Sequence, residues 1–267
     1  MRRKIVVTDV TRMQAGRVCV AGSLVDGAEA GRSVRPELRY GRPLLEGWLG
    51  VGDRVVVSPF AIVELDLQEH RPHPPHTEDW IVDERHRRRC GTLGDDERRA
   101  LLTELDDGSV AGIFGATVHE GRGWYVLDGE GARSLGTVEA ARVSQVFFEP
   151  KSLRGGWNYR LAFADAAGRA YNLAVTDLAY RYYLDYLRDV EELEPPRVAR
   201  HVLATLRQAE HVFLRVGLAR GWSDEAERRC HLQINGVYAF PDLLGGRCFA
   251  DLAPDAGYRY DPREVPF

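Results

Sequence analysis

Residues 159–175 read YRLAFADAAGRAYNLAV, and this stretch decides the fold class. The runs on either side of Ala166-Ala167-Gly168 are rich in the aromatic and aliphatic residues that strands prefer. The glycine between them supplies the positive φ that a tight reversal needs. The stretch therefore predicts a β-hairpin with strands at 159–164 and 170–175.

Further strand-like runs occur in both halves of the chain. Those of the first half are rich in Val, Ile and Thr, and Gly16, Asp26-Gly27 and Gly52-Asp53 separate them as turn or loop signals. This pattern predicts one small barrel in each half. Besides the hairpin, the expected strands are 4–10, 17–24, 31–36, 54–59, 61–67, 116–119, 123–127, 142–148, 211–218 and 230–238, the last broken at Asn235-Gly236.

Helices are expected between these strands. Asp95-Asp96-Glu97 precedes leucines on one helical face, Thr176-Asp177 is a helix N-cap pattern, and Pro195-Pro196 starts a third helix. The predicted fold class is therefore a β-rich α+β protein. Because 267 residues exceed the usual size of one domain, we expect a first unit over 1–114, closed by its helix, and a second over 115–267 with a helical insert and C-terminal strands.

The composition excludes several classes of protein. Hydrophobic residues make up 44% and charged residues 28%, which is the balance of a folded chain. The sequence lacks an apolar run of membrane-spanning length and a signal-peptide core, so we expect a cytoplasmic protein with no membrane partner. Four dispersed cysteines argue against a zinc ribbon. A formal net charge of −4 means that any nucleic-acid site is a local patch.

A segment rich in histidine and proline, residues 70–80, concentrates side chains that could carry chemistry. His76 with Glu78 or Asp79 could form an acid and base pair or, with a divalent metal, cleave nucleic acid. The histidines recur every three residues as metal ligands can, but the prolines keep the segment extended, so its side chains need not converge. We therefore expect no bound metal and no cofactor.

The same segment has a structural interpretation. Trp80 offers a large apolar anchor, and Thr77 or Asp79 can cap a local turn. The nearby carboxylates Glu64 and Asp66, which could also hold a metal, alternate with leucines as on an exposed strand face. The sequence contains no GxxxxGK[ST], GxSxG, HExxH or GxGxxG motif. These observations favour a packed loop without a catalytic residue.

Arg85-His86-Arg87-Arg88-Arg89 is a basic patch in an acidic chain. Arginine contacts phosphate, and aromatic rings beside arginine stack on unpaired bases in proteins that bind single strands. We predict phosphate contacts from Arg85, Arg87, Arg88 and Arg89, and base stacking by Trp157 and Tyr159. Arginine also stands beside aromatic residues at 180–183, where core packing is the better interpretation, and at 258–260.

Four motifs give the chain a family resemblance: Val7–Arg12, Arg35-Pro36, Pro74–Trp80 and Leu232–Asp242. With them the chain resembles the dual OB-containing domain family of prokaryotes. The resemblance implies two OB-type barrels, nucleic-acid binding, and a setting in prokaryotic conflict or repair systems beside effector proteins. The barrels agree with the strand pattern, since an OB fold is built from five short strands.

We expect an accessory module that binds RNA or single-stranded DNA without catalysing a reaction. One alternative is a metal-assisted nucleic-acid-processing enzyme that uses His76, Glu78 and Asp79, for which metal-dependent cleavage would be diagnostic. The other is a protein-interaction scaffold that docks an effector protein. Such a scaffold would bind its partner but show no salt-sensitive affinity for oligonucleotides.

Overall fold

A computed structural model describes residues 1–151, 156–221 and 228–253 of the chain. The first half forms a closed five-stranded barrel in which the strands follow the order β1-β2-β3-β8-β7 and return to β1. All neighbours are antiparallel except β3 and β8, which are parallel. This is the strand order of an OB fold. The strands are β1 (Arg2–Arg12), β2 (Arg17–Leu24), β3 (Ser33–Glu37), β7 (Ala61–His70) and β8 (Asp79–Thr92).

The connection between β3 and β7 carries several short elements. Trp48 and Leu49 are buried within it and join the hydrophobic core. The elements are η1 (Arg39–Gly41), β4 (Leu44–Leu45), η2 (Glu46–Leu49), β5 (Gly50–Val51) and β6 (Arg54–Val55).

The second half repeats the OB order. The strand that opens this barrel is interrupted, so that β11 pairs with β15 and β12 pairs with β13. The ring continues from β13 to β14, from β14 in parallel to β16, and from β16 to β15. The strands are β11 (Leu135–Glu139), β12 (Arg142–Pro150), β13 (Trp157–Ala164), β14 (Ala170–Val175), β15 (His211–Leu218) and β16 (Arg229–Phe240). A short hairpin, β9 (His119–Gly121) and β10 (Gly123–Leu127), adds to this sheet through β16.

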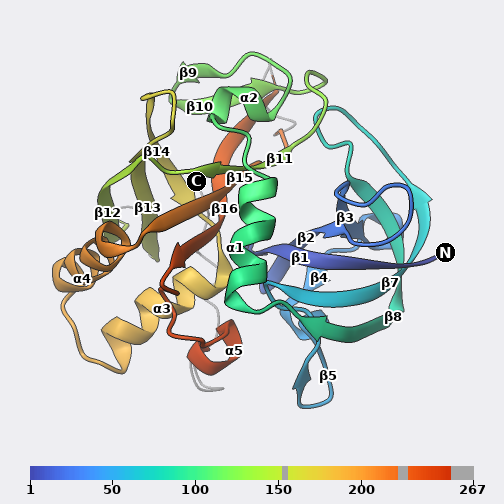
Figure 1. Ribbon diagram of the computed structural model, residues 1–267, viewed down its shortest axis with the longest axis horizontal. Helices are drawn as coiled ribbons and strands as arrows, with labels where there is room; N and C mark the ends of the chain where they lie inside the picture. The colour runs from blue at the N-terminus through green and yellow to red at the C-terminus, as the bar shows by residue number, and fades with distance from the viewer. Residues whose placement is uncertain (152–155, 222–227, 254–267) are drawn as a thin grey trace.

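In the described residues, five α-helices connect and cover the barrels. Asp177 caps α3 by accepting hydrogen bonds from the N–H groups of Ala179 and Tyr180, and prolines at the first positions of α4 suit a helix start. Figure 1 shows α1 between the two barrels, with the first barrel on the right and the second on the left. The helices are α1 (Asp95–Glu104), α2 (Val110–Ile113), α3 (Leu178–Asp189), α4 (Pro195–Gln208) and α5 (Phe249–Leu252).

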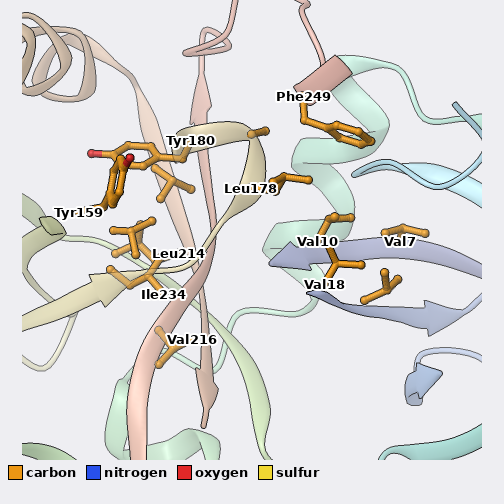
Figure 2. Packing of buried hydrophobic residues seen from close by; sticks show 14 of the residues in the cluster. Val7, Val10, Val18, Tyr159, Leu178, Tyr180, Leu214, Val216, Ile234 and Phe249 are labelled. Atoms are coloured by element: carbon orange, nitrogen blue, oxygen red, sulfur yellow. The ribbon is translucent and has the colours of Figure 1, made fainter. Parts of the chain in front are cut away.

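The two barrels share one hydrophobic core. Figure 2 shows Val10 and Val18 from the first barrel and Leu214 and Ile234 from the second as members of the same buried cluster. A smaller cluster joins Phe60, Leu102 of α1 and Phe213 of β15. The described chain therefore packs as one body rather than as two independent barrels.

The predicted fold class, a β-rich α+β protein with two OB-like barrels and connecting helices, is confirmed by this topology. The hairpin at 159–175 forms as β13 and β14, with Gly168 at φ +80° in the turn. The domain division at residues 114 and 115 stays a prediction. No helix in the described ranges is long and apolar enough to cross a membrane.

Candidate nucleic-acid interface

Part of the outer side of the first barrel's sheet is covered by the second barrel. Along β1, β2 and β3 and at the start of β8, outward residues alternate with core valines and leucines, yet most of them are themselves buried. This side includes the face of the second and third strands, through which OB folds grip oligonucleotides. In the first barrel that face is therefore used for docking the second barrel. Its buried polar and small residues are Asp9, Thr11, Ala21, Ser23, Arg35 and Asp79.

Buried ion pairs hold this seam between the barrels. Arg215 of β15 donates to Asp9 of β1, with Nη2 and Nε lying 2.9 and 3.1 Å from Oδ2. Both side chains are at most 4% exposed. Arg35 and Arg220 approach Asp79 from the two barrels, each 2.6 Å from a different carboxylate oxygen. A charge buried with a partner in this way stays satisfied, whereas one left alone is strongly destabilising.

The segment Pro74–Trp80 runs from the turn after β7 into the first two residues of β8, and it also packs on the second barrel. The carbonyl of Pro74 accepts a hydrogen bond from the Gly129 N–H, and the Thr77 hydroxyl donates to the Ala132 carbonyl at 2.6 Å. Trp80 is half-buried and stacks on His70, with the ring centres 4.7 Å apart. The segment is thus a packed loop, but Thr77 bonds across the seam instead of capping its own turn.

The carboxylates of this segment are occupied by protein donors. Glu78 is buried and accepts from both the N–H and the hydroxyl of Ser134, at 2.6 and 3.1 Å. Asp79 binds its two arginines through different oxygens, so its side chain pairs across the seam rather than capping a turn. Glu64 lies on β7 and binds Arg88, while Asp66 binds the N-terminal ammonium group.

His76 is buried beside Cys230, whose Sγ lies 4.0 Å from the ring Nε2. Burial, with smaller contributions from the charges of Arg35, Arg220 and His73, lowers the pKa of His76 to about 2. The ring is therefore neutral at physiological pH. Within the ranges that the structure describes, no three His, Cys, Asp or Glu side chains are placed to hold a metal ion. The geometry gives His76, Glu78 and Asp79 structural partners and adds nothing in favour of the enzyme alternative.

The basic run lies on β8 of the first barrel, where alternate residues point to opposite sides of the strand. Arg88 forms an ion pair with Glu64 at 3.0 Å, and Arg89 donates to the Val55 carbonyl and to Thr92. Arg85 is exposed. The run is thus a strand with several of its charges already engaged, and its phosphate contacts stay a prediction.

Arg87 differs from its neighbours because its guanidinium donates to three backbone carbonyls, those of Trp48, Glu84 and Gly50. We expect Arg87→Gln to lower the free energy of unfolding by about 1–3 kcal/mol, since those carbonyls lose charged donors. Arg85→Gln, on an exposed site, should change it by less than about 0.5 kcal/mol. Urea unfolding of both variants checks this, and equal losses would contradict the structural role of Arg87.

The aromatic residues predicted to stack on bases have packing partners. Tyr159 is buried, its hydroxyl donates to Asp185 at 2.8 Å, and the Arg181 guanidinium lies 4.8 Å from its ring centre. Trp157 is half-buried and stacks on Phe148 at 4.7 Å. Base stacking by these two rings stays a prediction, and it requires surface that their packing now occupies. The tyrosines of α3 are core residues, and residues 258–260 lie outside the described ranges.

The outer face of the second barrel is, by contrast, partly exposed in the described structure. One row of paired residues crosses it: Phe147 lies opposite Arg160, Arg160 opposite Ala174, and Ala174 opposite Gln233. All four are half-buried rather than buried. Arg160 is held in place by donating to the side chain and carbonyl of Asn172, at 3.0 and 2.6 Å. Burial lowers the pKa of Arg160, but arginine stays charged at neutral pH.

This face, called the open face below, is chemically mixed. Phe147, Arg160, Asn172 and Gln233 project from it, and small residues surround them. An aromatic ring, a fixed guanidinium and two amides are the groups that stack on bases, bind phosphate and hydrogen-bond base edges. The small residues on the same side are Ala162, Ala164, Ala170 and Ala174.

Part of the open face could have been found in the sequence. In 157–164 the apolar set Tyr159, Leu161 and Phe163 marks the inner side, which leaves Arg160 on the outer side. Gln233 could not be found in this way, because the register that aligns it with Arg160 joins strands far apart in sequence.

Comparison with curated proteins finds no match for this chain. The family model for the dual OB-containing domain matches residues 3–237. That range takes in the first strand and almost all of the last strand of the two barrels. The chain belongs to the dual OB-containing domain family.

Proposed function

We propose that this protein binds single-stranded nucleic acid, RNA or DNA, through the open face of its second barrel. The observation that carries the proposal is the contrast between the barrels. The equivalent face of the first barrel is buried against the second, and the open face presents Phe147, Arg160, Asn172 and Gln233. OB folds use this face and its adjoining loops to bind oligonucleotides.

The chemistry of the open face supports an unpaired strand over a duplex. A single strand exposes the flat faces of its bases, on which Phe147 can stack, while Arg160 neutralises a phosphate. A polybasic surface would suit duplex backbone binding, and the chain carries a net charge of −4. The modest positive charge of the face therefore fits a binder that relies on stacking as much as on ion pairing.

We also propose that the protein is a cytoplasmic accessory module of a prokaryotic conflict or repair system and works beside an effector protein. This cellular setting is proposed from the family alone. Binding without cleavage is the activity expected, because the side chains proposed for catalysis, His76, Glu78 and Asp79, are buried in the seam.

Phe147→Ala should weaken binding of a labelled single strand of about 12 nucleotides by roughly 5- to 100-fold, the value of one base stack. Arg160→Gln should weaken it too and reduce the slope of log affinity against log salt by about 0.7, one phosphate contact. Fluorescence anisotropy with DNA and RNA probes over a salt series measures both effects.

The competing interface is tested with Arg85→Gln combined with Arg88→Gln, which removes two exposed charges from β8 of the first barrel. If the strand lies on the open face alone, this double variant should keep the affinity and salt slope of the parent. If it weakens binding and the open-face variants do not, the phosphate contacts predicted for β8 form the interface. If the parent binds neither probe, the proposed function is wrong.

A further inference from the structure

The β9–β10 hairpin extends the sheet of the second barrel beyond its five OB strands. Within it, β10 pairs with the N-terminal end of β16, so that Tyr125 lies opposite both His231 on β16 and His119 on β9. Figure 1 places the hairpin at the top of the second barrel, above β14. The hairpin carries an aromatic cluster. It lies outside the five-stranded ring of the barrel and outside the seam between the barrels.

Tyr125 is the centre of this cluster. Its ring stacks on His119 with 5.2 Å between centres and an interplanar angle of 20°. The His231 ring lies 5.9 Å away and tilted, and the Arg229 guanidinium lies 4.7 Å from the Tyr125 ring centre. We call Tyr125 and His119, with His231 and Arg229 beside them, the hairpin platform. It combines π faces with a cation, as surfaces that stack on bases do.

The hairpin platform differs from the core aromatics next to it. Trp124, the preceding residue, points to the opposite side of β10, where it packs on the buried Tyr171 with ring centres 4.9 Å apart. Trp124, Tyr125 and His119 are all half-buried, so the side of the strand, not the exposed fraction, separates them. The contact with Tyr171 explains the placement of Trp124 and leaves that of Tyr125 unexplained.

The platform and the open face lie on the same side of the sheet. On β16, the residues at 230, 232 and 234 are buried, so His231 and Gln233 both point outward. Gln233 ends the row that begins at Phe147, and His231 starts the pairing to Tyr125. β14 and β10 both pair with the edge of β16 that β15 does not use, so Phe147 and Tyr125 are no more than four inter-strand steps, or about 19 Å, apart along the sheet.

We propose that the single strand bound on the open face continues onto the hairpin platform, where a base stacks on Tyr125. This inference rests on the proposed function and adds to it a second stacking site outside the five-stranded barrel. At about 3.4 Å per stacked nucleotide, the track from Phe147 to Tyr125 spans about six nucleotides. That length falls within the roughly 4–16 nucleotides that one OB fold covers.

The first test uses affinity. Tyr125→Ala should weaken binding of an oligothymidine of about 12 nucleotides by roughly 5- to 100-fold, and Tyr125→Phe, which keeps the ring, should bind like the parent. The matched control is Tyr40→Ala, which removes a tyrosine that is 93% exposed on the first barrel, and it should leave affinity unchanged. In the parent, affinity should rise with oligothymidine length up to about six nucleotides and then level off.

A second measurement does not depend on how a variant folds. The same oligothymidine, with 5-iododeoxyuridine placed at successive positions, should crosslink to Tyr125 from one end and to Phe147 from positions about six nucleotides away. If Phe147→Ala weakens binding while Tyr125→Ala and the crosslinks show no contact at the hairpin, this inference fails and the proposed function stands. If the parent binds neither this oligothymidine nor the RNA probe and gives no crosslink, both fail.

Discussion

Replacing Arg215 with Met is expected to lower the free energy of unfolding by about 3–5 kcal/mol, because the change leaves the carboxylate of Asp9 buried without its cation. Within the described residues Asp9 forms its ion pair with Arg215, whose Nη1 also donates to the Thr137 hydroxyl at 2.8 Å. Asp9 keeps a hydrogen bond from the Thr8 hydroxyl at 2.7 Å, which cannot replace a neutralising charge. Urea unfolding of parent and variant gives the difference directly.

Two further variants show whether the loss comes from the pair. Combining Arg215→Met with Asp9→Asn removes both charges, so the double variant should be more stable than Arg215→Met alone. Arg99→Met breaks an ion pair with Asp96, which is 97% exposed, and should cost less than about 1 kcal/mol. If Arg215→Met costs no more than Arg99→Met, the ion pair does not hold the barrels together.

The motifs that give the family resemblance meet at this seam. Asp9 and Arg12 belong to the first motif, and the Arg12 N–H donates to the Thr176 carbonyl of the second barrel at 2.7 Å. Glu78 and Asp79 come from another motif and bind second-barrel donors. In the last motif, the Tyr238 hydroxyl donates to the Thr8 carbonyl at 2.7 Å. The motifs therefore specify how two OB barrels dock.

Local sequence signals were enough to predict many elements of the fold, but they missed β11 (Leu135–Glu139), and the strand expected over 54–59 forms only as β6 (Arg54–Val55). The hairpin at 159–175, the cap at Asp177 and the helix that starts at Pro195 all depend on residues within a few positions of one another, and all three form. Docking of the barrels could not be predicted, because it depends on pairs such as Asp9 and Arg215, which are 206 residues apart. The burial of the first barrel's outer face follows from that docking, so it could not be predicted from the sequence either.

Two differences show where local signals mislead. Asn235-Gly236 suits a tight turn, but β16 continues through it: Arg215 pairs with Gly236 and Val216 with Ile234, so Asn235 forms a bulge. Its side chain accepts a hydrogen bond from the Thr176 hydroxyl.

Within the candidate site, the sequence drew attention to the basic and aromatic segments of 85–89 and 157–160. Composition alone could not tell which residues face outward, because that depends on strand phase and on what covers the sheet.

His76 should contribute less to stability in mild acid than at neutral pH. Burial lowers the pKa of this ring from 6.5 to about 2, so between these values the unfolded chain binds a proton at His76 that the folded chain does not. The His76 contribution to the free energy of unfolding therefore falls as the pH falls below 6.5, by about 1.4 kcal/mol per unit and by about 2 kcal/mol between pH 7.5 and 5. The contribution of His76 is fully present only above pH 6.5.

His76→Gln should remove this contribution, so that the difference in unfolding free energy between parent and variant shrinks by about 2 kcal/mol from pH 7.5 to pH 5. Comparing the two proteins is necessary because burial raises the pKa of Asp177 to about 7, and that shift acts the other way, with stability lost as pH rises from about 4 through 7. Asp177 is present in both proteins, and its effect cancels in the difference. His73→Gln, in the same loop but exposed, should show no change of this kind. A constant difference between parent and His76→Gln across the range would mean that the buried ring takes up a proton without disturbing the seam.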